Sequence, residues 1–149
     1  MNPKLFEITC HECGHQWFVK MDTVLHHEFQ KKIVYVYDYS LFYHKCSKCE
    51  ASIKFVYPLV YYFPKQSVII SLGCEGNNFA QAQNYRVETI EAFCEYVKIV
   101  DSGKDIDSII ALKQRLTQYE VIYYDGSNQE NLFFIADGVP IVVAIKENA

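Results

Sequence analysis

Two short stretches decide the fold of this chain: residues 10–13 read CHEC and residues 46–49 read CSKC. A Cys-x-x-Cys turn lets two thiolates converge on one metal ion, and two such turns complete a tetrahedral shell. The predicted ligands of one structural Zn²⁺ are Cys10, Cys13, Cys46 and Cys49. The same four sulfurs suit iron in a rubredoxin-like site, so iron stays open as the alternative metal.

The insert between the two pairs, residues 14–45, is longer than the spacing of a compact zinc ribbon. We therefore expect the insert to be structured. Leu5–Thr9 alternates and predicts a strand into the first pair, and Gln16–Lys20 predicts a strand out of it. Val34–Tyr43 is β-branched and aromatic and predicts a strand into the second pair.

Asp22–Ile33 is ambiguous, and one interpretation is a short helix capped by Asp22 or Thr23, with Leu25 and Phe29 on one side. Further along, the apolar runs Ala51–Phe63 and Ser67–Leu72 predict strands.

Pro64-Lys65-Gln66 between those two runs indicates a hairpin. Pro58 cannot donate a hydrogen bond to a neighbouring strand, so it marks an edge or a bulge. Residues 73–86 are polar and predict a loop.

Beyond this loop the apolar period changes to about 3.6 residues, which predicts a helix. Its apolar stripe contains Ile90, Phe93, Cys94, Val97 and Val100. Thr89 is the expected cap, and Gly103 the expected stop. A second helix is expected from Asp105 or Asp107 to about Thr117, so that the pair makes a helical hairpin packed on the sheet.

The C-terminal region returns to strands, predicted at Val121–Tyr124, Leu132–Ala136 and Val139–Ile145. Asp137-Gly138 is a strong two-residue turn signal, and Asp125-Gly126 is a similar one. The predicted fold class is α+β: zinc-ribbon-like N-terminal knuckles on an antiparallel β-sheet, with a helical hairpin inserted before the C-terminal strands. We expect one domain over residues 1–149, with a zinc-knuckle portion at 1–55 and the sheet plus helical hairpin at 56–149.

The composition is that of a folded globular protein: 149 residues, 50% hydrophobic and 21% charged. The formal net charge of −4 repels a phosphate backbone, which disfavours nucleic acid as a partner. The N-terminal residues lack the pattern of a secretion signal, and no apolar run approaches the length that spans a bilayer. We therefore expect a cytoplasmic protein without membrane contact, where thiols stay reduced and paired cysteines indicate a metal.

Other side chains near the cysteines have expected roles outside the metal shell. His11, His15 and His44 are predicted to lie beside the thiolates and help to balance their charge. Cys94 is a predicted core residue, whereas Cys74 in a glycine-flanked loop leaves a reactive thiol open as an alternative. No catalytic residue and no cofactor-binding loop is predicted.

The two pairs, the aromatic run at residues 55–62 and the following strand at Val68-Ile69-Ile70 resemble the bacterial and archaeal CpXC proteins. The resemblance implies coverage of most of the chain and assigns no biochemical role. Members of that family carry two Cys-Pro-x-Cys motifs. Here His11 and Ser47 stand in place of the prolines, and Glu50 stands where a glycine commonly follows, which would strain the second turn without removing a ligand.

Three function hypotheses follow from the sequence. The first is a zinc-stabilised, non-enzymatic domain that binds another protein or its own copy, based on the density of tyrosine. The second is a zinc-ribbon protein that binds nucleic acid through the knuckles, near which Lys31, Lys32, Lys45, Lys48 and Lys54 cluster. The third is a small-molecule sensor or enzyme with a pocket between the sheet and the helical hairpin.

Overall fold

The computed structural model describes residues 3–28, 36, 39–75 and 82–145. The architecture is mixed α+β, and it divides into two compact units, Met1–Cys94 and Glu95–Ala149. The boundary falls inside helix α2 (Ile90–Asp101). The boundary expected between the zinc-knuckle portion (1–55) and the portion with the sheet and the helices (56–149) lies inside the first unit.

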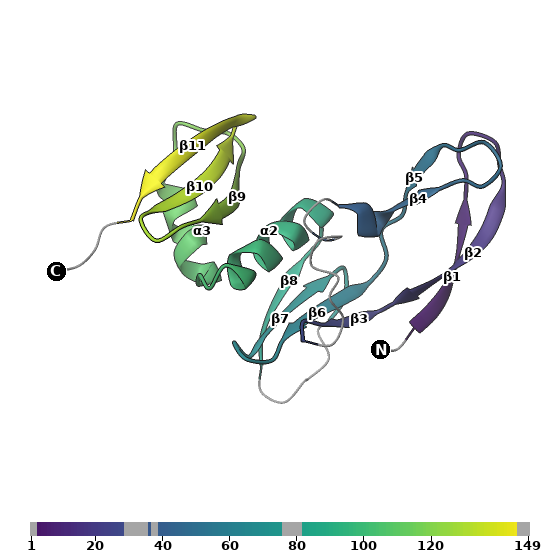
Figure 1. The fold of residues 1–149 in the computed structure, drawn as a ribbon, viewed down its shortest axis with the longest axis horizontal. Coiled ribbons are helices and arrows are strands. Elements are labelled where there is room, and N and C mark those ends of the chain that lie inside the picture. Colours follow the sequence, from purple (N-terminus) through teal and green to yellow (C-terminus); the bar gives the residue numbers. More distant parts are fainter. Residues whose placement is uncertain (1–2, 29–35, 37–38, 76–81, 146–149) are drawn as a thin grey trace. The chain divides into compact units, whose positions relative to one another are not determined.

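Two antiparallel hairpins carry the cysteine pairs in the first unit (Figure 1). Strands β1 (Pro3–Thr9) and β2 (Gln16–Asp22) flank the first pair. Strands β4 (Tyr43–Lys45) and β5 (Ser52–Lys54) flank the second. Each predicted cysteine turn therefore lies at the tip of a hairpin.

The remaining strands of this unit form a four-stranded sheet in the order β3-β6-β7-β8. The strands are β3 (Val24–His26), β6 (Leu59–Phe63), β7 (Val68–Leu72) and β8 (Gln83–Val87). The hairpin predicted at residues 64–66 is confirmed, because β6 and β7 pair antiparallel. The expected antiparallel pairing holds for most strand pairs of the described residues, but this sheet is mixed, because β3 pairs parallel with β6 and β7 pairs parallel with β8. Parallel neighbours need long crossovers, and the crossover from β3 to β6 contains the second cysteine pair.

The short helix expected over Asp22–Ile33 is wrong where the structure describes it. Val24 and Leu25 are buried in β3, and the Thr23 carbonyl accepts a hydrogen bond from the Val60 N–H at 2.9 Å. Pairing with β6 outweighs the weak local helix signal. Phe29 lies outside the described residues.

Two further boundaries differ from the predictions. Where a strand was expected up to Tyr43, the described residues show a 3₁₀ turn η1 (Ser40–Phe42), preceded by Tyr39 with φ 63°. Part of the expected loop at 73–86 is strand β8, whose polar sequence hides its pairing with β7. The Ser71 hydroxyl donates to the Asn84 side-chain oxygen at 3.0 Å across this pair.

The helices begin and end close to the predicted residues. Thr89 Oγ1 accepts the Ala92 N–H at 3.1 Å at the start of α2, which confirms the predicted cap. Helix α3 (Ile106–Arg115) begins after Asp105, whose carboxylate accepts the Ser108 N–H at 3.0 Å.

Three antiparallel strands close the second unit in the order β11-β10-β9. They are β9 (Ile122–Ser127), β10 (Asn131–Ala136) and β11 (Val139–Ala144). The Asp137-Gly138 turn is confirmed, with φ 49° and 80° at its two residues. The turn expected at Asp125-Gly126 is wrong: both residues lie within β9, at an irregularity opposite Phe133 and Phe134.

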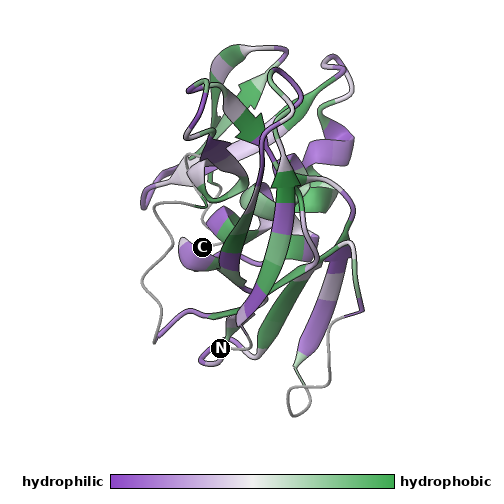
Figure 2. Ribbon diagram, turned by 90° about the vertical axis from the view of Figure 1, so that its right-hand side faces the viewer, coloured by the Kyte–Doolittle hydropathy of each residue, from purple (hydrophilic) through white to green (hydrophobic). Residues whose placement is uncertain are grey.

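Hydropathy alternates along several of the strands, as expected for sheets with one buried face (Figure 2). In β10 the buried residues are Leu132, Phe134 and Ala136. Glu95, only 4% exposed, joins three elements of the second unit. Its carboxylate accepts from Lys113 Nζ at 2.8 Å and from the Tyr124 N–H at 2.6 Å, so it links α2, α3 and β9.

Candidate metal centre

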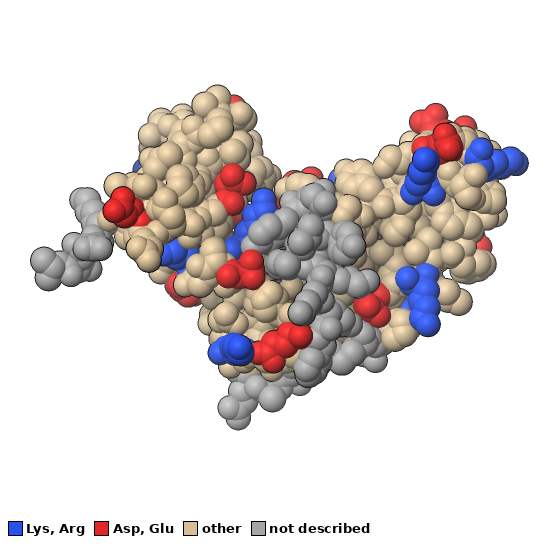
Figure 3. Space-filling model, in the orientation of Figure 1, with Lys and Arg blue, Asp and Glu red and all other residues tan. Residues whose placement is uncertain are grey.

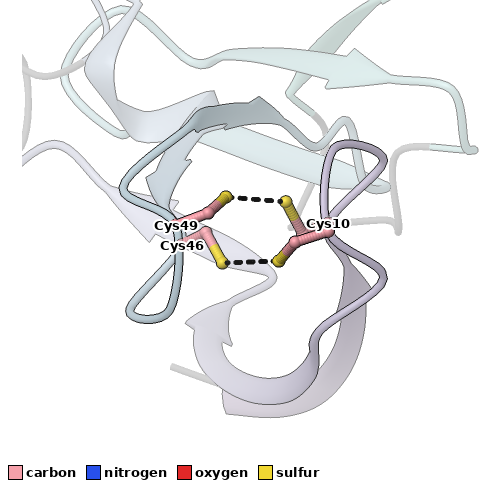
Figure 4. A group of neighbouring side chains, drawn as sticks. Cys10, Cys46 and Cys49 are labelled. Atoms are coloured by element: carbon pink, nitrogen blue, oxygen red, sulfur yellow. Dashed lines mark hydrogen bonds between the residues drawn. The ribbon is translucent and has the colours of Figure 1, made fainter.

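The structure brings the four predicted cysteines together. Each Sγ atom of Cys10, Cys13, Cys46 and Cys49 lies within 4.8 Å of the other three. Sulfur atoms from the two loops face each other in two pairs, Cys10 with Cys49 at 3.5 Å and Cys13 with Cys46 at 3.7 Å (Figure 4). Disulfide bonding requires about 2.05 Å, so these are free thiols arranged around a common centre.

The two loops have the same backbone hydrogen bonds. In the first knuckle (residues 10–15), the Cys10 N–H donates to the His15 carbonyl and the Gly14 N–H donates to the Cys10 carbonyl, both at 2.8 Å. In the second knuckle (residues 46–51), the Cys46 N–H donates to the Ala51 carbonyl and the Glu50 N–H donates to the Cys46 carbonyl, both at 2.9 Å. The two cysteine pairs are therefore presented by equivalent turns.

The residue after each pair has a left-handed backbone conformation. Gly14 has φ 77° and Glu50 has φ 66°. Glycine adopts this conformation without cost, whereas a side chain crowds the following carbonyl oxygen. The strain expected at the second turn from the absence of glycine is thus located at Glu50.

Within each pair, the first cysteine is buried and the second is exposed. Cys10 and Cys46 are 1% and 0% exposed and pack with Ile8 and Ile53 in a small apolar cluster. Trp17, Val19, Ala51 and Phe55 pack against this cluster. The cysteines therefore join a core made by both hairpins, and Cys13 and Cys49 lie on its solvent side.

Hydrogen bonding favours a thiolate at Cys46. The backbone N–H of Cys49 is the main cause, burial acts against it, and the Lys48 N–H adds to it, so that the pKa of Cys46 falls to about 7. The Ala51 N–H lowers the pKa of Cys49, but the Cys10 thiol and burial outweigh it and raise that pKa to about 12. Hydrogen bonding therefore favours the thiolate form of Cys46, which is the form of cysteine that binds a metal.

None of the described histidines belongs to the group of four ligands. His15 stacks on Trp17 with ring centroids 5.5 Å apart, and its Nε2 lies 3.4 Å from Ser47 Oγ. That contact joins the first knuckle to the second and was not predicted from the sequence, although Ser47 stands where the CpXC motif has a proline. His11 contacts Glu12 at 3.3 Å. The Nε2 atom of His44 is buried and has no hydrogen-bond partner among the described residues, and burial lowers the pKa of His44.

The other two cysteines lie apart from the centre. Cys94 is fully buried, which confirms it as a core residue. Cys74 packs beside Val24, Val60 and Ile69, and its thiol donates to the Leu59 carbonyl at 3.9 Å. Burial raises the pKa of Cys74, which argues against a reactive thiol.

Fold and site together define an α+β protein whose N-terminal unit holds four cysteines that could coordinate one metal ion. Comparison with protein-family models, curated proteins and solved structures finds no match. Over the described part of the chain, neither helix has the length and apolar character needed to cross a membrane.

Proposed function

We propose that the chain is a zinc-stabilised, non-enzymatic domain that binds protein, and that one Zn²⁺ joins its two knuckles in a zinc-ribbon-like arrangement. The observation that carries the proposal is the cluster of four thiols. Sulfurs at about 2.3 Å from a tetrahedral ion lie roughly 3.8 Å from one another, and the facing pairs here are at 3.5 and 3.7 Å. With all four sulfurs within 4.8 Å of one another, movements of about 1 Å or less would close a shell.

A metal held by four thiolates has no open position for a substrate or a catalytic water. Its contribution is structural, because it joins two hairpins whose shared apolar cluster is small. Thiolate ligands suit zinc and also iron, so iron with the same four sulfurs is the alternative metal. We also propose a relationship to the CpXC proteins, which rests on the two Cys-x-x-Cys pairs and the aromatic run that follows them in the sequence.

The proposed protein binding is supported by exposed apolar side chains on the first unit. Leu5 and Phe18 are 62% and 64% exposed and lie on the face of β1 and β2 opposite the buried Ile8. Large apolar groups held in water together on one face are typical of contact surfaces. The partner is either another protein or a second copy of this chain.

Native mass spectrometry of the untagged protein tests the metal. We expect one zinc per chain, lost in Cys13→Ser and Cys49→Ser and retained in the matched control Cys74→Ser. Protein free of metal, or full zinc content in both ligand variants, would refute the proposal. Sedimentation velocity of the wild type and of Phe18→Ser tests self-association: a shared surface on β1 and β2 predicts a weaker dimer in the variant.

Nucleic-acid binding is the second candidate, and the distribution of charge favours it more than the net charge does. Residues 1–94 contain nine basic and nine acidic residues, whereas residues 95–149 contain five basic and nine acidic ones. The first unit therefore has a formal net charge of zero, and the negative charge of the chain belongs to the second unit. Basic and acidic side chains are nevertheless interspersed on the face shown in Figure 3. Binding of DNA or RNA that weakens steeply with salt would favour this candidate.

A further inference from the structure

A groove with a volume of about 530 Å³ lies beside helix α3, and all of its walls belong to the second unit. One wall is a stripe of α3 that includes Ile109 and Leu112. The other is the C-terminal end of β11, residues 143–145, and Leu132 lines the groove between them. The surface inside the groove is therefore mainly aliphatic.

The groove lies at a sheet edge to which no strand of the described residues is paired. Strand β11 is the outer strand of the sheet, and its sequence, VPIVVA, contains no charged residue. Edge strands of soluble proteins usually carry charges or other features that block pairing with another chain. Within β11, Pro140 is the residue of this protective kind.

The register shows which backbone groups the edge presents. The Ile145 N–H donates to the Glu130 carbonyl at 2.8 Å, so this residue faces β10. Because alternate residues of an antiparallel strand face opposite sides, Val142 and Ala144 direct their N–H and C=O groups to the open edge. Pro140 has no N–H. An added strand can therefore form hydrogen bonds mainly with the C-terminal half of β11, which lines the groove.

Two cations lie at the ends of the same groove. Lys104 immediately precedes the helix cap and Arg115 is the last residue of α3, so about 15 Å of helix separates them. Among the described residues neither makes an ion pair, whereas Lys98 and Lys113 pair with Asp125 and Glu95.

The nearest acidic residue on the groove wall does not neutralise these cations. The Asp105 carboxylate accepts from both the N–H and the hydroxyl of Ser108, at 3.0 and 2.8 Å, as the helix cap. Unpaired cations are unexpected in a unit with nine acidic and five basic residues. An acidic ligand would complement them.

We propose that the groove binds an extended peptide segment of a partner protein, with an apolar residue between two acidic residues, which adds as a fourth strand beside β11. This inference deepens the proposed protein-binding function and rests on it. The peptide backbone pairs with the open groups of Val142 and Ala144. At about 3.3 Å per residue, side chains at alternate positions of a five-residue segment span roughly 13 Å. An acidic-x-apolar-x-acidic pattern therefore matches the separation of Arg115 and Lys104.

A fluorescent peptide containing Glu-Thr-Leu-Thr-Glu, titrated into the full-length, metal-loaded protein, tests the proposal by anisotropy. We expect saturable binding that weakens about tenfold or more, equivalent to about 1.4 kcal/mol, in Arg115→Glu and in Lys104→Glu. Lys65→Glu has the same charge change in the first unit and should bind as the wild type does. Lys-Thr-Leu-Thr-Lys and Glu-Thr-Ser-Thr-Glu should both bind poorly.

Backbone pairing is tested separately by Ala144→Pro, which removes an N–H that points away from β10 and should leave the sheet folded. Circular dichroism checks the fold, and NMR shift changes should concentrate at residues 142–145 and along α3. The inference would be overturned by equal binding of acidic and basic peptides, by no binding to the folded protein, or by shift changes elsewhere. Self-association in sedimentation that Ala144→Pro abolishes would overturn it as well, because a second copy of the chain would then occupy this edge. Metal content is a separate readout, so loss of zinc and loss of peptide binding are distinguishable failures.

Discussion

Glu50 carries backbone strain in the second knuckle at a position where the first knuckle has glycine. Replacing it by glycine should stabilise the metal-loaded protein by about 0.5 to 1 kcal/mol, because the left-handed conformation then costs little. Urea unfolding at fixed zinc measures the change. The ion pair between Glu50 and Lys45, 3.7 Å apart on exposed side chains, contributes little to the stability of the wild type.

Two controls separate backbone strain from charge at this position. Glu50→Gln keeps the strain and should leave stability near that of the wild type. Gly14→Ala should destabilise the protein by about 1 kcal/mol, and a Cβ there meets no atom within 4 Å, so any loss comes from the backbone alone. If Glu50→Gly is no more stable than Glu50→Gln, the backbone at residue 50 is not strained.

Cys74 should react slowly with iodoacetamide in the folded protein. Burial raises its pKa above the usual value of a thiol, so less thiolate is present at pH 8, and the rate should climb as the pH rises past 9. Peptide mass spectrometry after timed alkylation gives the rate, with the urea-unfolded chain as the control. Equal rates in folded and unfolded protein would contradict the prediction.

At the scale of elements, Glu95 is the side chain on which α2, α3 and β9 all depend. Glu95→Gln leaves the Lys113 ammonium without its charge partner and should cost about 3 kcal/mol of unfolding free energy. Chemical denaturation measures it, and Glu120→Gln, an exposed carboxylate in the same unit, is the matched control. A loss below 1 kcal/mol would mean that packing alone holds these elements.

Elements with strong local signals were predictable from sequence. Thr89 and Asp105 cap the helices, and Asp137-Gly138 closes its hairpin, because each acts through neighbours a few residues away. Strand β8 was missed because its residues are largely polar and its partner β7 is supplied by tertiary structure. The irregular pairing of β9 at Gly126 was predicted as a turn, because glycine is common both in turns and in β-bulges.

The candidate site was predictable for a similar reason. Cysteine spacing alone identified the four sulfurs that the structure gathers. Contacts between distant loops were not predictable, such as His15 with Ser47, and neither was the pairing of a buried with an exposed cysteine in each turn. Tyrosine density did not distinguish core from surface: Tyr57, Tyr61 and Tyr124 are buried.

At the scale of the whole molecule, the metal centre lies entirely in one of two units. Removing metal with a chelator should increase hydrogen exchange in β1, β2, β4 and β5, whereas exchange in β9–β11 should change little. Exchange monitored by mass spectrometry, with Cys49→Ser as a metal-free reference, provides the test. A parallel loss of protection in β9–β11 would show instead that the chain unfolds as one cooperative domain.

The alternation of buried and exposed cysteines gives the centre an open side and a closed side. Within the described residues, Cys13 and Cys49 are the two ligands that solvent reaches, so chelators, competing cations and oxidants would approach through them. Ligand exchange would then proceed in order, with the outer sulfurs released first and the inner pair, held among Ile8 and Ile53, released last. The lifetime of a bound ion would therefore depend on how easily Cys13 and Cys49, at the loop tips, release it. The burial of Cys10 and Cys46 would determine how readily a partly released ion is bound again.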